Sequence, residues 1–575
     1  MPSQKISIKL NNKLIATEPG QTIMQIAAAN GVEIPSLCEH PDFPHKANCR
    51  VCVVEVTMPN SNGKSRLMTS CSVAAAEGMV IETDSPKVRR ARNTNLEMIY
   101  AEHIEKCATC VWRLNCKLLQ YAAKYKILLT TFKERKVDRP TYKFANAVEL
   151  DGSQCIDCRN CIEACSRIQG INYLEVKGKG VNQEVCPTSD KNIECILCGQ
   201  CAVHCPVSSA QEQYHYQEVE KVIADKKKIT VVQFAPSIRV SIGEELGLAY
   251  GDIVTEQMTE ALKLLGFDYV FDVNFAADVT TMVEAGELIE RITEKKPMPM
   301  ITSCCPAWVR YVEYYRPDLI PHLTTARSPQ IHLGGIIKTY WAEQVGVRPE
   351  DIALVSIMPC TAKKYEASRS ELKINGMDPV DYVLTTRELA FMIKSASIDF
   401  TKLKGVKTDN PLGEFTGAAA IYGGSGGVME SALRTAQAVI CGAESKLCHD
   451  RLEFLDTRGL DGIKETTVEM GQKKLKVAVI NGIGHFKEFE SRLMEYDYVE
   501  VMACPGGCIG GGGEPIPTTA EIRKQRMEAL QRIDRNQPVR EAHKNKGVKK
   551  ALDWLKTQGK LEHTVLHTTY EKRKK

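Results

Sequence analysis

The sequence predicts a multidomain protein that joins α+β modules to a larger α/β domain. A chain of 575 residues is longer than one hydrophobic core usually organises. Short alternating strands and clustered cysteines fill the first third, whereas apolar strands alternate with helical patterns beyond Lys228. An apolar fraction of 43% and a charged fraction of 25% are ordinary for a globular protein with a large core. We therefore expect several small N-terminal domains followed by one α/β domain.

Charge and hydropathy narrow the expected partners and location. The formal net charge is +4, from 75 basic and 71 acidic residues, so nucleic acid is not expected as a partner. The sequence has no apolar run of about 18 residues, so no membrane span is predicted. The first residues lack the apolar core of a signal peptide. We expect a cytoplasmic protein.

The 23 cysteines are unusual for a long chain in a reducing compartment, where disulfides are rare. They gather at spacings typical of metal ligands. Nineteen of them fall into such sets, so we interpret them as iron ligands rather than as disulfide partners.

Residues 1–83 begin with a predicted strand at Ile6–Leu10, a second at Leu14–Thr17 and a helix near Thr22–Asn30. Four cysteines follow with the spacing C-x10-C-x2-C-x18-C: Cys38, Cys49, Cys52 and Cys71. Zinc also binds four thiolates, but the neighbouring cysteine sets favour an electron carrier. The next segment, 84–139, is helical and charged and carries H-x3-C-x2-C-x5-C: His103, Cys107, Cys110 and Cys116.

Residues 140–215 contain an internal duplication that is typical of bacterial two-cluster ferredoxins. The spacing C-x2-C-x2-C-x3-C occurs twice: at Cys155, Cys158, Cys161 and Cys165, and at Cys195, Cys198, Cys201 and Cys205. In such proteins the fourth cysteine of each motif binds the other cluster. We therefore pair the first three cysteines with Cys205 and the second three with Cys165. Cys186 lies outside the pattern and is interpreted as a spare thiol. So many redox groups in a row indicate an electron path between a buried site and the surface.

The C-terminal half reads as α/β. A buried strand, ITVVQF, leads to Pro236 and Ser237, and a helix containing Ile242–Leu248 follows. Further strands are predicted at 269–273, 298–302, 352–358 and 476–481. No GxGxxG follows a strand, so a nicotinamide or flavin site is expected only on a partner.

Three cysteine cassettes lie in this half, and two of them directly follow predicted strands. They are TSCCP at Thr302–Pro306, MPCTAKK at Met358–Lys364 and MACPGGCIGGGGEP at Met502–Pro515. One thiolate from each of the first two and two from the third make the ligand set of one cubane cluster, with Cys304 left over: Cys305, Cys360, Cys504 and Cys508. The glycines of the third cassette leave bare backbone beside such a cluster.

The three cassettes in this order resemble the active-site motifs of [FeFe]-hydrogenases, and the resemblance extends over nearly the whole chain. It implies a β-grasp [2Fe-2S] domain at 1–83, a His/Cys3 [4Fe-4S] domain at 84–139, a two-[4Fe-4S] ferredoxin domain at 140–215, a catalytic domain at 216–517 and a helical, small-subunit-like segment at 518–575. The implied cofactors are one [2Fe-2S] cluster, three N-terminal [4Fe-4S] clusters and an H-cluster, in which a cubane is bridged, here through Cys508, to a diiron group with carbon monoxide, cyanide and dithiolate ligands.

The resemblance also implies roles for residues around the diiron group. Lys363 would pair with one cyanide, and Pro236 with Ser237 would face the other. The side chains expected to pack beside the metals or their ligands are Gln330, Met358, Tyr422 and Met502.

A proton route is implied as well. Cys304 would accept the proton first, and the route would continue through Glu287, Thr324 and Glu284. Arg291 and Glu366 would lie nearer the outside. Three positions depart from the usual family residues: Thr324 replaces serine, Arg327 replaces lysine and Tyr422 replaces phenylalanine.

The implied activity is reversible hydrogen oxidation and proton reduction, with electrons relayed to ferredoxin or to a flavoprotein or NAD(P)-linked partner subunit. Proteins that mature the diiron site are implied as further partners. The alternative is a non-catalytic iron–sulfur electron-transfer or assembly protein of the same fold. Cys304, Lys363 and the Pro236–Ser237 loop favour the enzyme, because a non-catalytic relative has no use for them.

Overall fold

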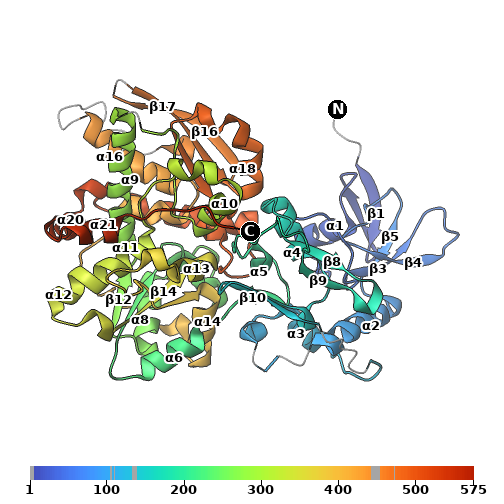
Figure 1. Cartoon of the computed structure of the whole chain (residues 1–575). Coiled ribbons are helices and arrows are strands. Elements are labelled where there is room, and N and C mark those ends of the chain that lie inside the picture. The colour runs from blue at the N-terminus through green and yellow to red at the C-terminus, as the bar shows by residue number, and fades with distance from the viewer. Residues whose placement is uncertain are drawn as a thin grey trace.

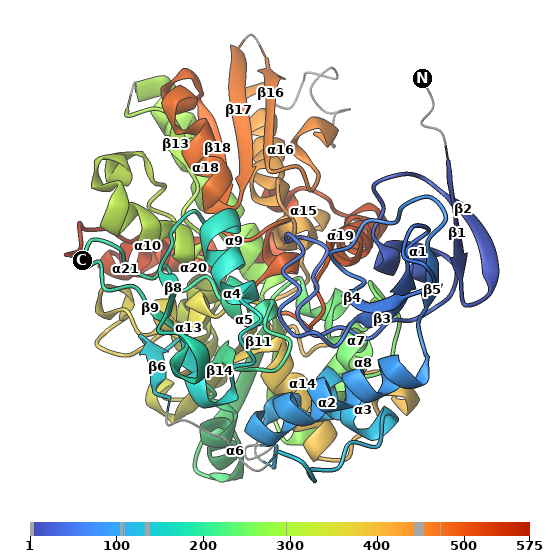
Figure 2. The same ribbon diagram turned by 90° about the vertical axis from the view of Figure 1, so that its right-hand side faces the viewer.

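The computed structural model describes residues 5–103, 107–108, 110–132, 139–294, 296–441, 454–471 and 473–574. Figure 1 shows the N-terminal modules, blue to cyan, beside a larger body that runs from green to red. The segment with α4 (Asn160–Glu163), α5 (Gln200–Val203) and β10 (Ala210–Glu212) lies between the two parts. Turned by 90°, Figure 2 shows α4 and α5 in front of the larger body.

The first module is a five-stranded sheet with α1 (Ile23–Ala29) packed on it. Its strand order is β2 (Lys13–Thr17), β1 (Ile6–Leu10), β5 (Val80–Glu82), β3 (Val53–Thr57) and β4 (Ser65–Thr69). The predicted first hairpin is confirmed. Asn11 and Asn12 turn it with φ values of 46° and 67°, the conformation that a type I′ turn needs. Thr22 caps α1 through a capping box with Gln25.

The second and third modules are small and contain little regular structure. The second module consists mainly of the helices α2 (Pro86–His103) and α3 (Lys117–Lys124). Arg92 of α2 donates hydrogen bonds to three backbone carbonyl oxygens of the first module. The third module has a sheet of β10, β7 (Val148–Asp151) and β6 (Thr141–Phe144) and a hairpin of β8 (Leu174–Lys177) and β9 (Glu184–Pro187).

The larger body contains two four-stranded sheets. The first is wholly parallel, in the order β12 (Tyr269–Asp272), β11 (Ile229–Phe234), β14 (Ile352–Met358), β15 (Tyr382–Thr385). The second has the order β13 (Met300–Ile301), β18 (Tyr498–Met502), β17 (Lys473–Asn481), β16 (Ile463–Met470), with only β16 and β17 antiparallel.

Helices cover both sheets, and α9 (Asn274–Glu294) occupies the centre. It contacts α11 (Pro329–Ile336), α15 (Gly417–Ala420) and α16 (Gly427–Cys441), so both sheets share one helical core. Further helices are α6 (Tyr216–Ala224), α8 (Thr255–Leu265), α10 (Pro306–Tyr315), α13 (Ala362–Ala367), α14 (Thr386–Ser395) and α18 (Ile483–Phe489).

Two predicted elements are shorter in the structure. The expected helix through Leu248 is one turn, α7 (Ile242–Glu245), because Gly247 leaves the helical region with φ of +90°. The expected strand at 298–302 keeps only Met300 and Ile301, and Pro299 before it has no N–H to donate. The strands β15, β16 and β18 were not predicted. In β18 the buried Glu500 interrupts the apolar run that marks such a strand.

The C-terminal segment is helical, as predicted, with α19 (Ala520–Asn536), α20 (Lys546–Thr557) and α21 (Lys560–Leu566). Its end is fixed to the body by a β-bridge between Ala326 and His567, with backbone bonds from Arg327 to Leu566 and from Thr568 to Thr325. Among the described residues, no helix is both long and apolar enough to cross a membrane.

Candidate active site

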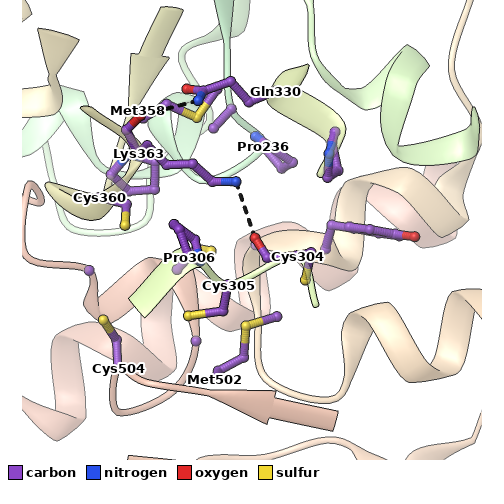
Figure 3. A pocket seen from close by; sticks show the side chains of 18 of the residues that line it. Pro236, Cys304, Cys305, Pro306, Gln330, Met358, Cys360, Lys363, Met502 and Cys504 are labelled. Atoms are coloured by element: carbon purple, nitrogen blue, oxygen red, sulfur yellow. Dashed lines mark hydrogen bonds between the residues drawn. The ribbon is translucent and has the colours of Figure 1, made fainter. Parts of the chain in front are cut away.

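A buried cavity lies at the carboxyl ends of strands from both large sheets (Figure 3). A water molecule can occupy about 80 Å³ of it, and almost all of its surface is apolar, as is typical of sites that bind small molecules. The first cassette follows β13, the second follows β14 and the third follows β18. The first two cassettes follow strands as expected, and the third follows β18, which was not predicted. Strand ends are where α/β sheets commonly hold their ligands.

The four predicted cubane cysteines all line this cavity: Cys305, Cys360, Cys504 and Cys508. Burial, followed by the neighbouring Cys305, raises the pKa of Cys360 to about 12. The pKa of Cys504 is raised well above its usual range by burial and by the adjacent thiols. Cys504 is buried, and the other three cysteines are partly exposed where they line the cavity. Thiols gathered away from bulk water are costly to ionise unless a metal neutralises them. The donor set therefore fits an iron–sulfur cluster.

The glycines of the third cassette are required by close packing as well as by any cluster. A Cβ on Gly511 would lie 2.2 Å from the Pro359 carbonyl oxygen of the second cassette. A Cβ on Gly507, which has φ of +87°, would lie 2.7 Å from the backbone nitrogen of Ser425. Only glycine allows the cassettes to approach this closely.

Lys363 reaches across the cavity wall toward the first cassette. Its Nζ donates to the Cys304 carbonyl oxygen at 3.1 Å and to Glu366 Oε2 at 2.8 Å (Figure 3). Burial alone would lower the pKa of Lys363, but the Glu366 carboxylate and nearby thiols outweigh burial and raise it. The ammonium is therefore a fixed positive charge inside the cavity wall.

Glu366 does not lie nearer the outside, as the sequence led us to expect. Only 7% of the residue is exposed. Its Oε2 accepts bonds from Lys363, from Ser328 at 2.9 Å and from Gln330 Nε2 at 3.1 Å. It thus lies behind the cavity wall, bonded to two of the residues that line the cavity.

The predicted packing residues of the cavity are mostly in place: Pro236, Gln330, Met358, Tyr422 and Met502 line it. Ser237 does not line it but lies behind, fully buried and close to Gly423. The Tyr422 hydroxyl lies 2.8 Å from Thr281 Oγ1, and Thr281 lies 2.7 Å from Ser431 Oγ. The departure from phenylalanine is thus accommodated by a hydrogen-bond partner.

The two glutamates of the expected proton route lie in the opposite order from the one predicted. Burial is the largest cause that raises the pKa of Cys304, and the charge of Glu284 is the second. Glu284 therefore lies close to Cys304 and is the inner of the two carboxylates. Glu284 is 1% exposed and accepts a bond from the Tyr498 hydroxyl at 2.9 Å. Burial first, with Glu287 and Glu500 adding to it, raises the Glu284 pKa to about 8, although the Tyr498 bond opposes the shift.

Glu287 is the outer carboxylate. It accepts a bond from the Thr324 hydroxyl at 2.8 Å and pairs with Arg291 at 2.6 Å. Both Glu287 and Arg291 line a second cavity that opens to solvent, in line with the outer position expected for Arg291. The two glutamates share one face of α9, but sequence spacing alone did not show which end of that face meets the cavity.

The four N-terminal thiol sets also gather as predicted. Cys52 Sγ lies 3.4 Å from Cys71 Sγ, and the Cys49 amide lies 3.5 Å from Cys38 Sγ. Burial raises the pKa of Cys110 to about 11; the Trp112 amide opposes the rise, and the neighbouring Cys116 and Cys107 add to it. His103 Nδ1 lies 2.9 Å from the Gln154 carbonyl oxygen. A carbonyl only accepts, so Nδ1 carries the hydrogen and Nε2 keeps the lone pair that binds a metal.

The duplicated motifs place each fourth cysteine beside the other motif. Burial is the largest cause that raises the pKa values of Cys155, Cys158 and Cys195. The charge of Cys205 adds to the rise at Cys155 and Cys158, and the charge of Cys165 adds to it at Cys195. Burial and then Cys504 of the buried cavity raise the pKa of Cys198. The second motif therefore adjoins the active-site cassettes.

Backbone contacts hold this junction tightly. Gln200 Nε2 donates to the Gly510 carbonyl at 2.9 Å and Thr361 Oγ1 donates to the Leu197 carbonyl at 2.8 Å. A Cβ on Gly512 would lie 2.5 Å from the Cys198 carbonyl oxygen. The cassette and the ferredoxin-like motif thus pack backbone to backbone.

Sequence reasoning missed several polar residues around the site: Thr281, Tyr498, Glu500, Thr325 and His567. Their positions depend on contacts across 38 to 242 residues of sequence, for example between Thr325 and His567. Glu500 inside an otherwise apolar strand was the one available signal, because a buried carboxylate needs a reason.

The thiol sets, the buried cavity and the carboxylate route define an iron–sulfur oxidoreductase. Comparison with known families agrees. Residues 228–512 match the family "Iron only hydrogenase large subunit, C-terminal domain", and residues 520–573 match "Iron hydrogenase small subunit". Residues 3–86 match "2Fe-2S iron-sulfur cluster binding domain", and residues 92–128 match "NADH-ubiquinone oxidoreductase-G iron-sulfur binding region".

Individual relatives extend over the whole chain. The NADP-reducing hydrogenase subunit HndD of Solidesulfovibrio fructosivorans is 37% identical, covering 99% of this chain and 99% of the relative. Iron hydrogenase 1 of Clostridium pasteurianum is 37% identical over 98% of this chain and 100% of its own length. The solved structure of a variant of the [FeFe]-hydrogenase HydA1 from Chlamydomonas reinhardtii has a TM-score of 0.56 and 37% identity, covering 62% of this chain and 98% of its own.

The chain belongs to the [FeFe]-hydrogenase family. It is a hydrogenase that oxidises hydrogen and reduces protons, and its electrons pass through N-terminal iron–sulfur groups.

Proposed function

We propose that Cys305, Cys360, Cys504 and Cys508 hold the cubane of the H-cluster, with Cys508 bridging to the diiron group. The observation that carries the proposal is that four thiols from three distant cassettes line one buried cavity. When bound, the cluster supplies the place where hydrogen is split or formed and where electrons are taken up. The protein's own residues bind it, exclude water and move the proton.

Lys363 is proposed to orient the diiron group. An ammonium has three donor hydrogens, and two are engaged by Cys304 and Glu366. The third is available to an anionic ligand such as cyanide in the cavity. Pro236, Met358 and Met502 close the remaining wall with apolar atoms, which keeps water from the reacting group. Gln330 and Tyr422 complete the lining, and Ser237 supports Pro236 from behind.

We further propose the proton route Cys304, Glu284, Thr324, Glu287, with Arg291 at its outer end. Glu284 suits the inner position, because a carboxyl with a pKa of about 8 is present in both protonation states near neutral pH. Thr324 can still pass a proton, since its hydroxyl both donates and accepts.

The N-terminal sites are proposed to hold one [2Fe-2S] and three [4Fe-4S] clusters. The proposed domains are those expected from sequence: a β-grasp domain at 1–83, a His/Cys3 domain at 84–139 and a two-cluster ferredoxin domain at 140–215. The catalytic domain at 216–517 and the small-subunit-like segment at 518–575 follow them. His103 is the proposed imidazole ligand. Asn48, near the first set, donates to the Asp157 carbonyl at 3.2 Å, and Cys116 neighbours Cys205. Both peripheral clusters therefore adjoin the first ferredoxin cluster, and the second ferredoxin cluster adjoins the H-cluster.

The electron partner is proposed to be ferredoxin or a flavoprotein or NAD(P)-linked subunit. The likeness to HndD, which is described as a subunit of an NADP-reducing hydrogenase, supports a multimeric assembly. Maturation proteins would install the diiron group. We also propose a reducing, cytoplasmic location, in which the many metal-binding thiols stay available.

The ligand assignment is tested by Cys360→Ser and Cys504→Ser, with Cys186→Ser as the matched control. Cys186 is also buried but lies in β9 outside every thiol set. We expect each ligand variant to lose about six irons per chain, about four from the cubane and about two from the diiron group, because one ligand of a four-thiolate set is gone. The infrared bands of metal-bound carbon monoxide and cyanide should disappear with them. The control should keep both. Full iron content in the ligand variants would refute the assignment.

A further inference from the structure

Beyond Glu287, a hydrogen-bonded chain continues into the C-terminal segment. Glu287 Oε2 accepts from the Thr325 amide at 2.9 Å and from the Thr325 hydroxyl at 3.1 Å. Thr325 Oγ1 in turn lies 2.9 Å from His567 Nδ1. The carboxylate of Glu287, the hydroxyl of Thr325 and the imidazole of His567 therefore form one continuous hydrogen-bonded chain. It runs from the end of the proton route to the tail.

His567 is held in place by backbone structure. It forms the β-bridge with Ala326, and the Thr568 amide donates to the Thr325 carbonyl at 2.8 Å. Its own carbonyl accepts from Arg327 Nε at 2.8 Å. A ring fixed on both sides in this way keeps its distance to Thr325 without depending on a flexible loop.

The ring also reaches solvent. His567 lines the second cavity together with Glu287 and Arg291, here called the exit cavity. Glu284, Glu287 and Thr324 account for the inner part of the route, but Glu287 itself is held by Arg291 and two threonine hydroxyls. A paired carboxylate of this kind exchanges protons with water poorly, so a group that can both take and release protons near neutral pH is needed beside it.

We propose that Thr325 and His567 form the outer end of the proton route, so that the small-subunit-like segment supplies the residue that exchanges protons with solvent. In the inward direction the ring takes a proton from water at Nε2 and gives its Nδ1 proton to Thr325 Oγ1. The hydroxyl proton of Thr325 moves to the Glu287 carboxylate. One proton enters, one is delivered, and no electrons move; the outward direction is the reverse.

After each passage the ring carries its hydrogen on the other nitrogen. It returns to the starting tautomer by exchange with water in the exit cavity, which His567 borders. The charged or titratable groups that face it from its own helix and from neighbouring elements are Glu562, His563, Glu287, Arg291, Arg327, Glu290, Lys296 and Lys556. Burial is the main cause that lowers the His567 pKa, and Glu287 and Glu562 act against it.

The test compares His567→Gln and His567→Ala with His563→Gln in the fully loaded enzyme. His563 lies in α21, which His567 caps, and its ring centroid is 5.2 Å from that of His567, but its side chain is exposed. General acid–base groups contribute about 10²–10⁴-fold, and because water can partly replace a terminal one we expect a loss of roughly tenfold in both directions. Added imidazole should restore the rate of His567→Ala, and Thr325→Val should lose activity while Thr325→Ser keeps it.

A second measurement does not depend on turnover. In protein without the diiron group, the infrared carboxyl band of Glu287, assigned with Glu287→Gln, should shift over the pH range in which His567 titrates. The shift should vanish in His567→Gln and persist in His563→Gln. Unchanged rates in both His567 variants would overturn the proposal. A second result would also overturn it: a loss of rate that imidazole does not rescue, in a variant whose Glu287 band responds to pH as in the parent enzyme. That result would show a purely structural role for His567.

Discussion

Replacing Tyr498 with phenylalanine tests whether Glu284 controls proton transfer near the H-cluster. The Tyr498 hydroxyl donates to Glu284 Oε1 at 2.9 Å and favours the ionised carboxylate. Burial is the larger effect and leaves the Glu284 pKa at about 8. Without the hydroxyl the ionised form loses a donor, so the pKa of Glu284 must rise further.

The size of the shift follows from the strength of that bond. A hydrogen bond to a charged group is worth about 1.5–3 kcal/mol, and about 1.4 kcal/mol corresponds to one pKa unit. We expect a rise of at least about one unit. At pH 8 the ionised fraction of Glu284 then falls from about one half to roughly one in eleven. Hydrogen oxidation, in which Glu284 must accept a proton, should fall about fivefold at pH 8, while proton reduction should persist to higher pH.

Film electrochemistry over a pH series measures both directions on one sample. Tyr496→Phe is the matched control, because Tyr496 lies just before the same strand and its hydroxyl bonds Glu465 away from the cavity. The control profile should coincide with that of the parent enzyme. A Tyr498→Phe profile that also coincides with the parent would refute the placement of Glu284 on the route.

Two further predictions concern how the chain is held together. Asp534 accepts bonds from Arg434 and Arg540, which outweigh burial and lower its pKa to about 2. Asp534→Asn should cost about 1.5–3 kcal/mol, because the charged acceptor of these bonds is lost while Arg434 keeps its ion pair with Glu430. Thermal unfolding and limited proteolysis of α19 measure this loss, and an unaltered unfolding midpoint would contradict it. The control is Asp351→Asn at a partly exposed ion pair, which should change neither measurement. Gly512→Ala should separate the ferredoxin-like motif from the cassettes, because its Cβ would lie 2.5 Å from the Cys198 carbonyl. Oxidation of hydrogen with a protein electron acceptor should then fall more than oxidation with a small viologen, whereas equal losses would argue against an electron path through this contact.

Cysteine spacing made much of the site predictable. The thiol sets and cassettes could be recognised because iron ligands fall at short, fixed intervals and because proline and glycine mark the turns beside them. The strands β11 and β14 were predicted for another reason: both are mostly apolar, as buried parallel strands are.

The polar surroundings of the site could not be predicted in the same way. Glu284 and Glu287 stand three residues apart on α9, so sequence shows a shared face but not which residue points inward. Glu366 resembles a surface carboxylate in sequence, yet three donors hold it beneath the cavity. Tyr498 and His567 meet their partners across 214 and 242 residues, a relation that only the tertiary fold creates.

The short β-bridge between Ala326 and His567 has a consequence for how the tail must be attached. Two strands joined over so few residues bind weakly by themselves. Most of the tail's attachment comes instead from side chains that α19 and α20 bury against the body, such as Met527, Leu530 and Leu555. A covalent link gives the tail an effective concentration on the order of millimolar, whatever the protein concentration. Fusion of the two parts therefore keeps the tail docked in cells that make little of the enzyme.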